Sequence, residues 1–203
     1  MIDLMAAVIG NPEEVREFKS AESFYKWLSR HHDKEGELWI KIHKVDSGLK
    51  SITPKEAIDV VLCWGWIDAV RKRLDEKSYL QRYTPRRSKS IWSQINVDNV
   101  SRLVKEGRMT EHGLKQVEAA KSDGRWGRAY ASGKNMKIPD DLQAAIDANP
   151  RAKKMREKLS AQNRFALAFR MHQVKTESGR RKKIVAFVQM LERGDTIHPQ
   201  RQK

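Results

Sequence analysis

The chain contains 203 residues with a formal net charge of +15 and a pI of about 10.0. Its single cysteine, Cys63, excludes an intramolecular disulfide framework and fits a reducing compartment. No run approaches the roughly eighteen apolar residues of a transmembrane helix, and the start of the chain lacks the basic region of a signal peptide. We therefore expect a cytoplasmic protein without a transmembrane segment.

The positive charge is unevenly distributed along the chain. Residues 1–60 carry nine Lys or Arg and eleven Asp or Glu, net −2, whereas residues 61–203 carry 32 against 15, net +17. A field of this sign attracts phosphate, anionic lipid or an acidic partner. Only the part of the chain after residue 60 contributes to it.

The first third of the chain predicts a helix, a strand and a second helix. Ser20 is a suitable N-cap for a helix that ends near residues 33–36, and apolar residues alternate with other residues over 37–45, as in a half-buried strand. Thr53-Pro54-Lys55-Glu56 is a capping box with proline at the first helical position. Gly65 can end the helix that follows.

Two strands and two helices complete the N-terminal region. Residues 66–72 and 78–84 are predicted as an antiparallel pair, which makes a sheet of about three strands. Helical spacing then predicts one helix ending at Gly107 and another ending near Gly124. Residues 1–130 are thus predicted as an α+β domain, a small antiparallel sheet with flanking helices.

The remainder of the chain is predicted to be mainly helical. Residues 131–137 contain Ser, Gly and Asn and are typical of a linker. Residues 138–194 contain four helical patterns, interrupted by Asn149-Pro150, and form the predicted C-terminal module. Residues 195–203 are a short tail.

Two segments carry the most informative side chains, Gly65-Trp66-Ile67-Asp68 and Pro85-Arg86-Arg87-Ser88-Lys89-Ser90-Ile91-Trp92-Ser93. They resemble two motifs of the bacterial YdeI/OmpD-associated family, whose members are described as bacteriocin-protection proteins. Lys175-Thr176-Glu177-Ser178-Gly179-Arg180-Arg181 resembles the pattern before the last helix of that family's helical module, although Ser-Gly departs from the usual form. The resemblance covers about residues 20–194 and implies a role in stress or bacteriocin protection, but it names no reaction.

The second motif predicts an anion site. Arg86, Arg87 and Ser90 precede a helix that the pattern predicts to begin near Ile91 or Trp92. Backbone amides at a helix start, a hydroxyl and two guanidinium groups together bind phosphate or carboxylate. The alternative is that Ser90 only caps the helix and that the arginines pair with nearby acids.

Both motifs are predicted to line one pocket for a small anionic or peptide ligand. Trp92 and Asn96 lie one turn apart on the predicted helix, and Trp66 and Asp68 share one face of a strand. Core packing is the alternative for the tryptophans. The family resemblance adds Arg108 and Trp126, which follow helix-ending glycines. The predicted ligand-binding residues are Trp66, Asp68, Arg82, Arg86, Arg87, Ser90, Trp92, Asn96, Arg108 and Trp126.

Catalysis is a weaker hypothesis for the same residues. Asp68 beside Trp66 is expected to be partly desolvated, and such a carboxylate could serve as the general base of a hydrolase or transferase. A structural ion pair is the alternative. The sequence contains no Walker loop, no Gly-x-Ser-x-Gly, no His-Glu-x-x-His and no cysteine pair. We therefore predict a non-enzymatic binding protein without a metal or a cofactor.

The C-terminal module supports a different hypothesis, nucleic-acid binding. Residues 151–183 contain twelve Lys or Arg and two acids, net +10, which can grip nucleic acid or an anionic lipid surface through phosphate contacts. A solvated helix face is the alternative. The residues predicted for this role are Lys153, Lys154, Lys158, Arg180, Arg181, Lys182 and Lys183.

Overall fold

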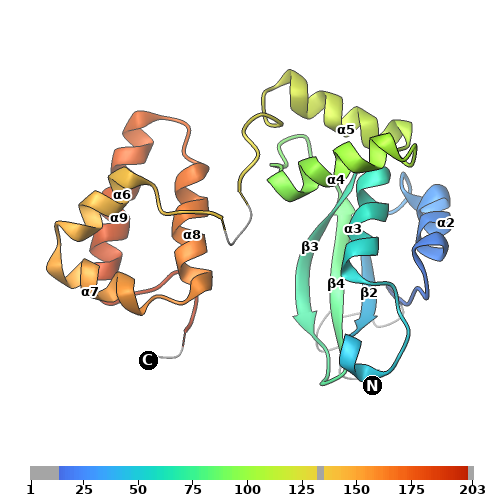
Figure 1. The fold of residues 1–203 in the computed structure, drawn as a ribbon, viewed down its shortest axis with the longest axis horizontal. Helices are drawn as coiled ribbons and strands as arrows, with labels where there is room; N and C mark the ends of the chain where they lie inside the picture. Colours follow the sequence, from blue (N-terminus) through green and yellow to red (C-terminus); the bar gives the residue numbers. More distant parts are fainter. Residues whose placement is uncertain (1–13, 132–134, 201–203) are drawn as a thin grey trace. The chain divides into compact units, whose positions relative to one another are not determined.

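The computed structural model describes residues 14–131 and 135–200 (Figure 1). The chain divides into two compact units, Met1–Ala129 and Tyr130–Lys203. Some predictions concern residues outside these ranges. They are the interpretation of residues 1–10, the middle of the predicted linker and the end of the predicted tail. Each unit is described separately below.

The N-terminal unit is built on a four-stranded sheet in the order β1-β2-β4-β3. The strands are β1 (Val15–Arg16), β2 (Leu38–His43), β3 (Trp66–Arg73) and β4 (Ser78–Pro85). β4 is antiparallel to both β2 and β3, whereas β1 is parallel to β2. The predicted α+β class is confirmed, but the predicted three strands omit β1, whose two residues are too few to show a pattern.

Helices pack beside this sheet, and the signals at both ends of α3 act as the sequence predicts. In the capping box, the Thr53 hydroxyl accepts from the amide of Glu56, and the Glu56 carboxylate accepts from the amide of Thr53 at 2.9 Å. Gly65 follows the helix with φ of 72°, a conformation that favours glycine. The helical segments are α2 (Ala21–His31), η2 (Val45–Ser47), α3 (Pro54–Cys63), α4 (Gln94–Lys105) and α5 (Glu111–Ser122).

The main core of this unit lies between the sheet and the helices α2 and α3 (Figure 1). Phe24 and Leu28 from α2 and Ile40 from β2 are fully buried there. On the other face of the sheet, Trp39 packs with two leucines and Lys41 pairs with Glu17 at 3.0 Å. The predicted half-buried strand is therefore wrong in this respect, because both faces of β2 are covered.

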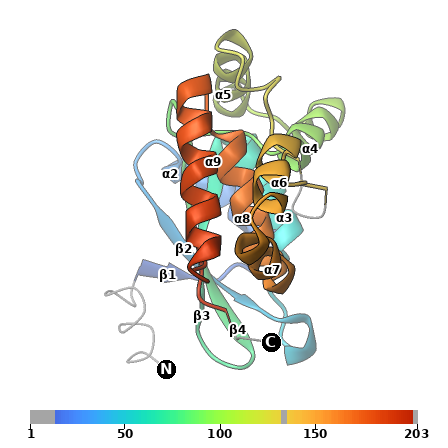
Figure 2. The same cartoon turned by 90° about the vertical axis from the view of Figure 1, so that its left-hand side faces the viewer.

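The described part of the C-terminal unit contains four helices around a core of its own. They are α6 (Asp140–Asp147), α7 (Pro150–Lys158), α8 (Ala161–His172) and α9 (Glu177–Glu192). α9 packs against the other three, and α6 also packs against α7 (Figure 2). The core contains Leu142, Ile146, Leu167, Met171 and Leu191. Among the described residues, no helix combines the length and the apolar character that crossing a bilayer requires.

Candidate functional site

The helix that was predicted to follow the arginine motif begins later than expected. α4 starts at Gln94, and its N-cap is Ser93, whose hydroxyl accepts from the amide of Asn96 at 3.2 Å. The predicted start at residue 91 or 92 is wrong because Trp92 is drawn into the core, where it is 2% exposed and lies edge-on to Trp126 at 4.9 Å. Ile91 and Trp92 therefore belong to the loop that precedes α4 and not to the helix.

Arg86 is a structural residue of this loop. Its amide donates to the carbonyl of Gly65 at 3.0 Å, and its Nη1 donates to the carbonyl of Ile91 at 3.2 Å. Its guanidinium carbon lies 3.5 Å from the centroid of the Trp92 ring, and the residue is 7% exposed. Such a cation over an indole stabilises the loop strongly because water is excluded from both groups.

Arg87 and Ser90 lie in an exposed turn of the same loop. The Ser90 hydroxyl accepts from the amide of Arg87 at 3.1 Å, and its carbonyl accepts from Nη1 of Arg125 at 2.8 Å. Ser90 thus stabilises a turn and does not cap α4. Arg87 is exposed to solvent.

Trp66 and Asp68 have different environments although both side chains belong to β3. Trp66 is 1% exposed, and its indole nitrogen donates to the carbonyl of His32 at 3.1 Å. Asp68 is exposed, opposite Tyr83 of β4. Burial raises the pKa of Tyr83, and the charge of Asp68 adds to that effect. The predicted desolvated carboxylate is therefore wrong, and the exposed carboxylate lacks the environment that would favour a general base.

The other predicted ligand residues are distributed among separate contacts. Arg82 pairs with Glu37 at 3.3 Å, on the opposite side of the sheet from the main helices. Arg108 pairs with Glu106 at 3.1 Å and lies 3.9 Å from Asp59. Asn96 is 8% exposed. The structure thus brings together Arg86, Trp92 and Trp126, in packed rather than open surroundings.

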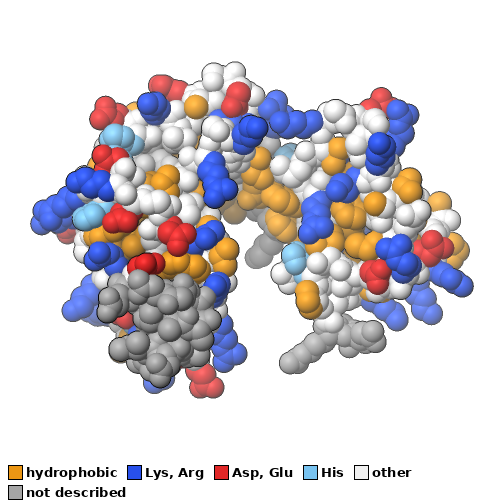
Figure 3. All heavy atoms as spheres, turned by 180° about the vertical axis from the view of Figure 1, so that it is seen from behind, with side chains coloured by type: hydrophobic (Ala, Val, Ile, Leu, Met, Phe, Trp, Pro, Cys, Tyr) orange, Lys and Arg blue, Asp and Glu red, His pale blue; other side chains and the backbone are white. Residues whose placement is uncertain are grey.

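The basic residues predicted in the C-terminal unit are mostly exposed. Lys153, Lys154 and Lys158 are exposed on α7, where the inward positions are occupied by Ala152 and Met155. Asn149 positions this helix, since its side-chain oxygen accepts from the first two amides that follow Pro150. Figure 3 shows Lys and Arg side chains spread over the visible face of both units without gathering in one patch.

On α9 some of the predicted basic residues already serve the fold. Nε and Nη2 of Arg180 donate to the two oxygens of Asp141 at 2.5 and 2.8 Å. Lys183 lies 5.7 Å from the centroid of the Phe187 ring, and Arg181 pairs with Glu177 at 3.4 Å. Lys182 is exposed.

A pocket of about 460 Å³ lies within the C-terminal unit, and the sequence reasoning did not identify it. Its apolar lining includes Met136, Ile138 and Phe165. Three cationic side chains and one amide complete the lining, from Lys137, Gln143, Arg156 and Arg164. Three cations beside an apolar wall can receive an anion that carries an apolar group.

Hydrogen bonds orient two of these cations. Nη2 of Arg156 donates to the side-chain oxygen of Gln143 at 3.0 Å, and Nη1 of Arg164 donates to the carbonyl of Leu159 at 2.6 Å. The Nε of Arg156 is buried and has no hydrogen-bond partner among the described residues. Lys137 is exposed. The lining residues belong to residues 136–138 and to α6, α7 and α8, so no local sequence motif predicts the pocket.

The comparisons with known proteins assign the two units differently. Residues 135–194 match the family model described as Bacteriocin-protection, YdeI or OmpD-Associated. The pocket and the helices α6 to α9 lie within the matched OmpD-associated segment. Residues 16–116, which contain the Gly-Trp-Ile-Asp and Pro-Arg-Arg motifs, match a domain of unknown function. No curated protein and no solved structure matches the chain.

Proposed function

We propose that the protein binds a small anionic ligand in the C-terminal pocket and that this binding serves a role in bacteriocin or stress protection. The observation that carries the binding proposal is the presence of Lys137, Arg156 and Arg164 around one hollow with an apolar wall. The protective role rests on the description of the family whose model matches this segment.

The chemistry of the lining indicates the class of ligand. Guanidinium groups bind phosphate and carboxylate through two parallel hydrogen bonds, and an ammonium group adds a further donor. Phe165 and Ile138 offer apolar surface to the remainder of the ligand. A phosphate or carboxylate attached to an aromatic or aliphatic group therefore fits the pocket better than an inorganic ion does.

Calorimetric titration of the full chain with phenyl phosphate and with inorganic phosphate tests this proposal. Phenyl phosphate is expected to bind more tightly, and Lys137→Gln and Arg164→Gln are each expected to weaken it by about tenfold. Arg170→Gln is the matched control, because Arg170 is exposed on α8 outside the pocket lining. Equal binding by all four proteins, or none, would reject the pocket.

The protective role needs a separate experiment in cells. Bacteria that produce the unchanged protein are expected to survive a bacteriocin challenge better than cells that produce Lys137→Gln at the same level. Equal protection by both proteins would show that the protective role does not depend on ligand binding in the pocket. Failure of both to protect, with intact ligand binding, would reject the role alone.

A second candidate function is nucleic-acid binding by the basic helices of the C-terminal unit. It is favoured by the exposure of Lys153, Lys154 and Lys158 along α7, because their ammonium groups make no ion pair with a described residue. Phosphate contacts of this kind release counterions, so affinity for a DNA duplex should fall steeply with salt. Replacing Lys153 and Lys154 by Gln should lower the slope of log affinity against log salt by about 1.8. The pair Lys55→Gln and Lys115→Gln, exposed in the other unit, is the control of equal charge.

A further inference from the structure

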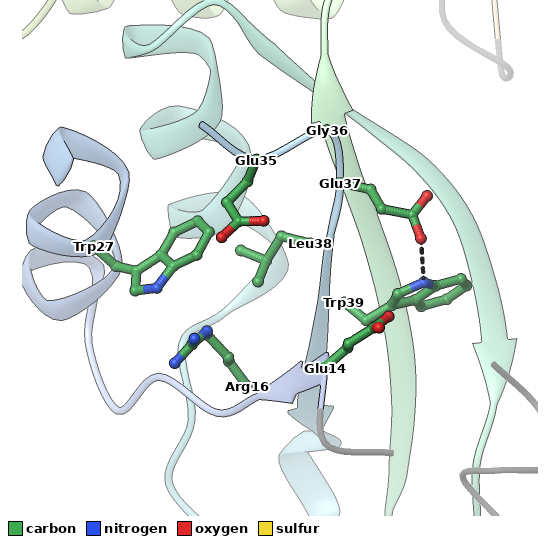
Figure 4. A pocket seen from close by; sticks show the side chains of 8 residues that line it. All are labelled: Glu14, Arg16, Trp27, Glu35, Gly36, Glu37, Leu38 and Trp39. Carbon is green, nitrogen blue, oxygen red and sulfur yellow. Dashed lines mark hydrogen bonds between the residues drawn. The ribbon is translucent and has the colours of Figure 1, made fainter. Parts of the chain in front are cut away.

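A second pocket, of opposite charge, lies at one edge of the sheet in the N-terminal unit (Figure 4). It is formed where β1 covers only two residues of β2, so that the segment leading into β2 borders an open hollow of about 390 Å³. The side chains important here are Glu14, Arg16, Trp27, Glu35, Glu37 and Trp39. The lining thus contains three carboxylates, two indoles and one guanidinium.

The carboxylates differ in what they already bind. Glu37 accepts from the indole nitrogen of Trp39 at 3.3 Å and pairs with Arg82 at 3.3 Å. Glu35 is exposed, and its carboxylate makes no hydrogen bond or ion pair with a described residue. In Figure 4 the Glu35 carboxylate lies on the side of β2 that holds Trp27, and Glu37 lies on the other side. Glu35 is therefore the carboxylate of this lining that remains available to a cation beside Trp27.

Arg16 shows which chemical group this part of the pocket accepts. Its guanidinium carbon lies 5.4 Å from the centroid of the Trp27 ring. Arg16 makes no ion pair with a described carboxylate, and its guanidinium lies over the indole of Trp27. An external cation that contacts both Trp27 and Glu35 would gain an ion pair that Arg16 lacks.

We propose that this pocket binds an alkylguanidinium or alkylammonium group. The bound cation displaces Arg16 from the Trp27 ring and donates a hydrogen bond to the Glu35 carboxylate. The face of an indole attracts a cation through its quadrupole, and a nearby carboxylate adds a charge-assisted hydrogen bond. Such a group is carried by the side chains of a basic peptide and by free polyamines. The proposal is independent of the C-terminal pocket, which selects the opposite charge.

The main chain beside the pocket distinguishes these two sources. A Cβ added to Gly36 would meet nothing within 4 Å, so the backbone that leads into β2 is accessible at this point. A peptide can place its main chain in the space beside Gly36 while its side chain enters the pocket, whereas a polyamine offers only its cationic groups. A basic peptide should therefore bind more tightly than a free cation if peptides are the natural ligands.

Calorimetric titration of the full chain with three probes tests the proposal. The probes are Nα-acetyl-arginine methylamide, the tripeptide acetyl-Gly-Arg-Gly-amide and spermidine. Saturable binding of at least one probe is expected. Tighter binding of the tripeptide would assign a peptide ligand, tighter binding of spermidine would assign a free polyamine, and no saturable binding of any probe would overturn the proposal.

Two substitutions with opposite expected effects make this test specific. Glu35→Gln should weaken the best probe by about tenfold, since it removes the charged acceptor. Arg16→Gln should tighten it by about threefold or more, since it removes the competing cation. The controls of equal charge change are Glu118→Gln and Arg73→Gln, both exposed outside this pocket lining.

The pattern across these variants decides the outcome. If Glu35→Gln behaves as Glu118→Gln does, or Arg16→Gln as Arg73→Gln does, general electrostatics explains the binding and the site is rejected. The replaced side chains are exposed, so these variants are expected to fold, and thermal unfolding of each provides the check.

Discussion

The guanidinium carbon of Arg86 lies 3.5 Å from the centroid of the Trp92 ring, and both residues are buried. This stacked pair joins the loop after β4 to the core formed by α3, α4 and α5. An arginine in a Pro-Arg-Arg motif is easily interpreted as a ligand-binding residue. Here its neighbours indicate a structural role instead, because the ring face is already covered and Nη1 is bonded to the loop.

Replacing Arg86 should therefore reduce stability. Arg86→Ala removes the contact with Trp92 and the hydrogen bond to the Ile91 carbonyl, and we expect the free energy of unfolding to fall by about 2–4 kcal/mol. Arg87→Ala changes an exposed neighbour and should alter it by less than about 0.5 kcal/mol. Urea unfolding of both variants provides the comparison. Equal, small effects would show that Arg86 is not needed for the fold.

Gly65 should be as sensitive as Arg86, for a reason that lies in the backbone. A Cβ at this position would lie 2.9 Å from the carbonyl oxygen of His112, and φ is 72°. Gly48 has φ of 73° but nothing within 4 Å of an added Cβ. Gly48→Ala should cost about 1–2 kcal/mol from conformation alone, and Gly65→Ala should cost more because the α3 to α5 contact must also shift. Thermal or urea unfolding that ranks the two equally would contradict this account.

Local signals in the sequence predicted much of the N-terminal fold. The capping box at Thr53 and the stop at Gly65 depend on neighbouring residues only, so they could be recognised without knowledge of the fold. β1 could not, because a two-residue strand exists only through its pairing with β2. The start of α4 was misplaced for a related reason, since the burial of Trp92 depends on Trp126, 34 positions away.

The candidate pockets were harder to predict than the elements that form them. Lys137, Arg156 and Arg164 share a pocket through helix packing, and their spacing in the chain resembles no motif. The pocket at the sheet edge likewise combines α2 with the approach to β2. The uneven charge along the chain agrees with the two pockets, since the sheet-edge pocket is formed by residues of the acidic 1–60 stretch and the other pocket by residues of the basic remainder.

The ion pair between Arg180 and Asp141 should make the C-terminal unit sensitive to acid. Its hydrogen bonds hold the pKa of Asp141 below the ordinary value of 3.8. A lowered folded-state pKa means that the stabilisation is fully present above the unfolded-state pKa and is lost as the pH falls through the folded-state pKa. Because both side chains are partly exposed, we expect no more than about 1 kcal/mol.

Comparison with Asp141→Asn would measure this contribution. The unchanged protein should be more stable than the variant at pH 7, and the difference should shrink in acid below pH of about 4. Asp140→Asn is the control, because Asp140 is exposed in the same helical turn and has no described partner. A difference that persists unchanged to the lowest pH would show that the charge of Asp141 is not what stabilises the unit.

Cys63 should be unreactive in the folded protein. The residue is fully buried at the end of α3, and burial raises the pKa of its thiol to about 11. Since the thiolate is the reactive form, a disulfide reagent such as Ellman's reagent should modify Cys63 slowly at pH 8 and rapidly in concentrated urea. Burial and the raised pKa act together here, so raising the pH to about 9.5 should accelerate the native reaction less than unfolding does.

Rapid modification of the native protein at pH 8 would require frequent opening of the contact between α3 and α5, where the Thr110 hydroxyl donates to the Cys63 carbonyl at 2.5 Å. Thr110→Val, which removes that hydrogen bond, should for the same reason increase the native rate of modification.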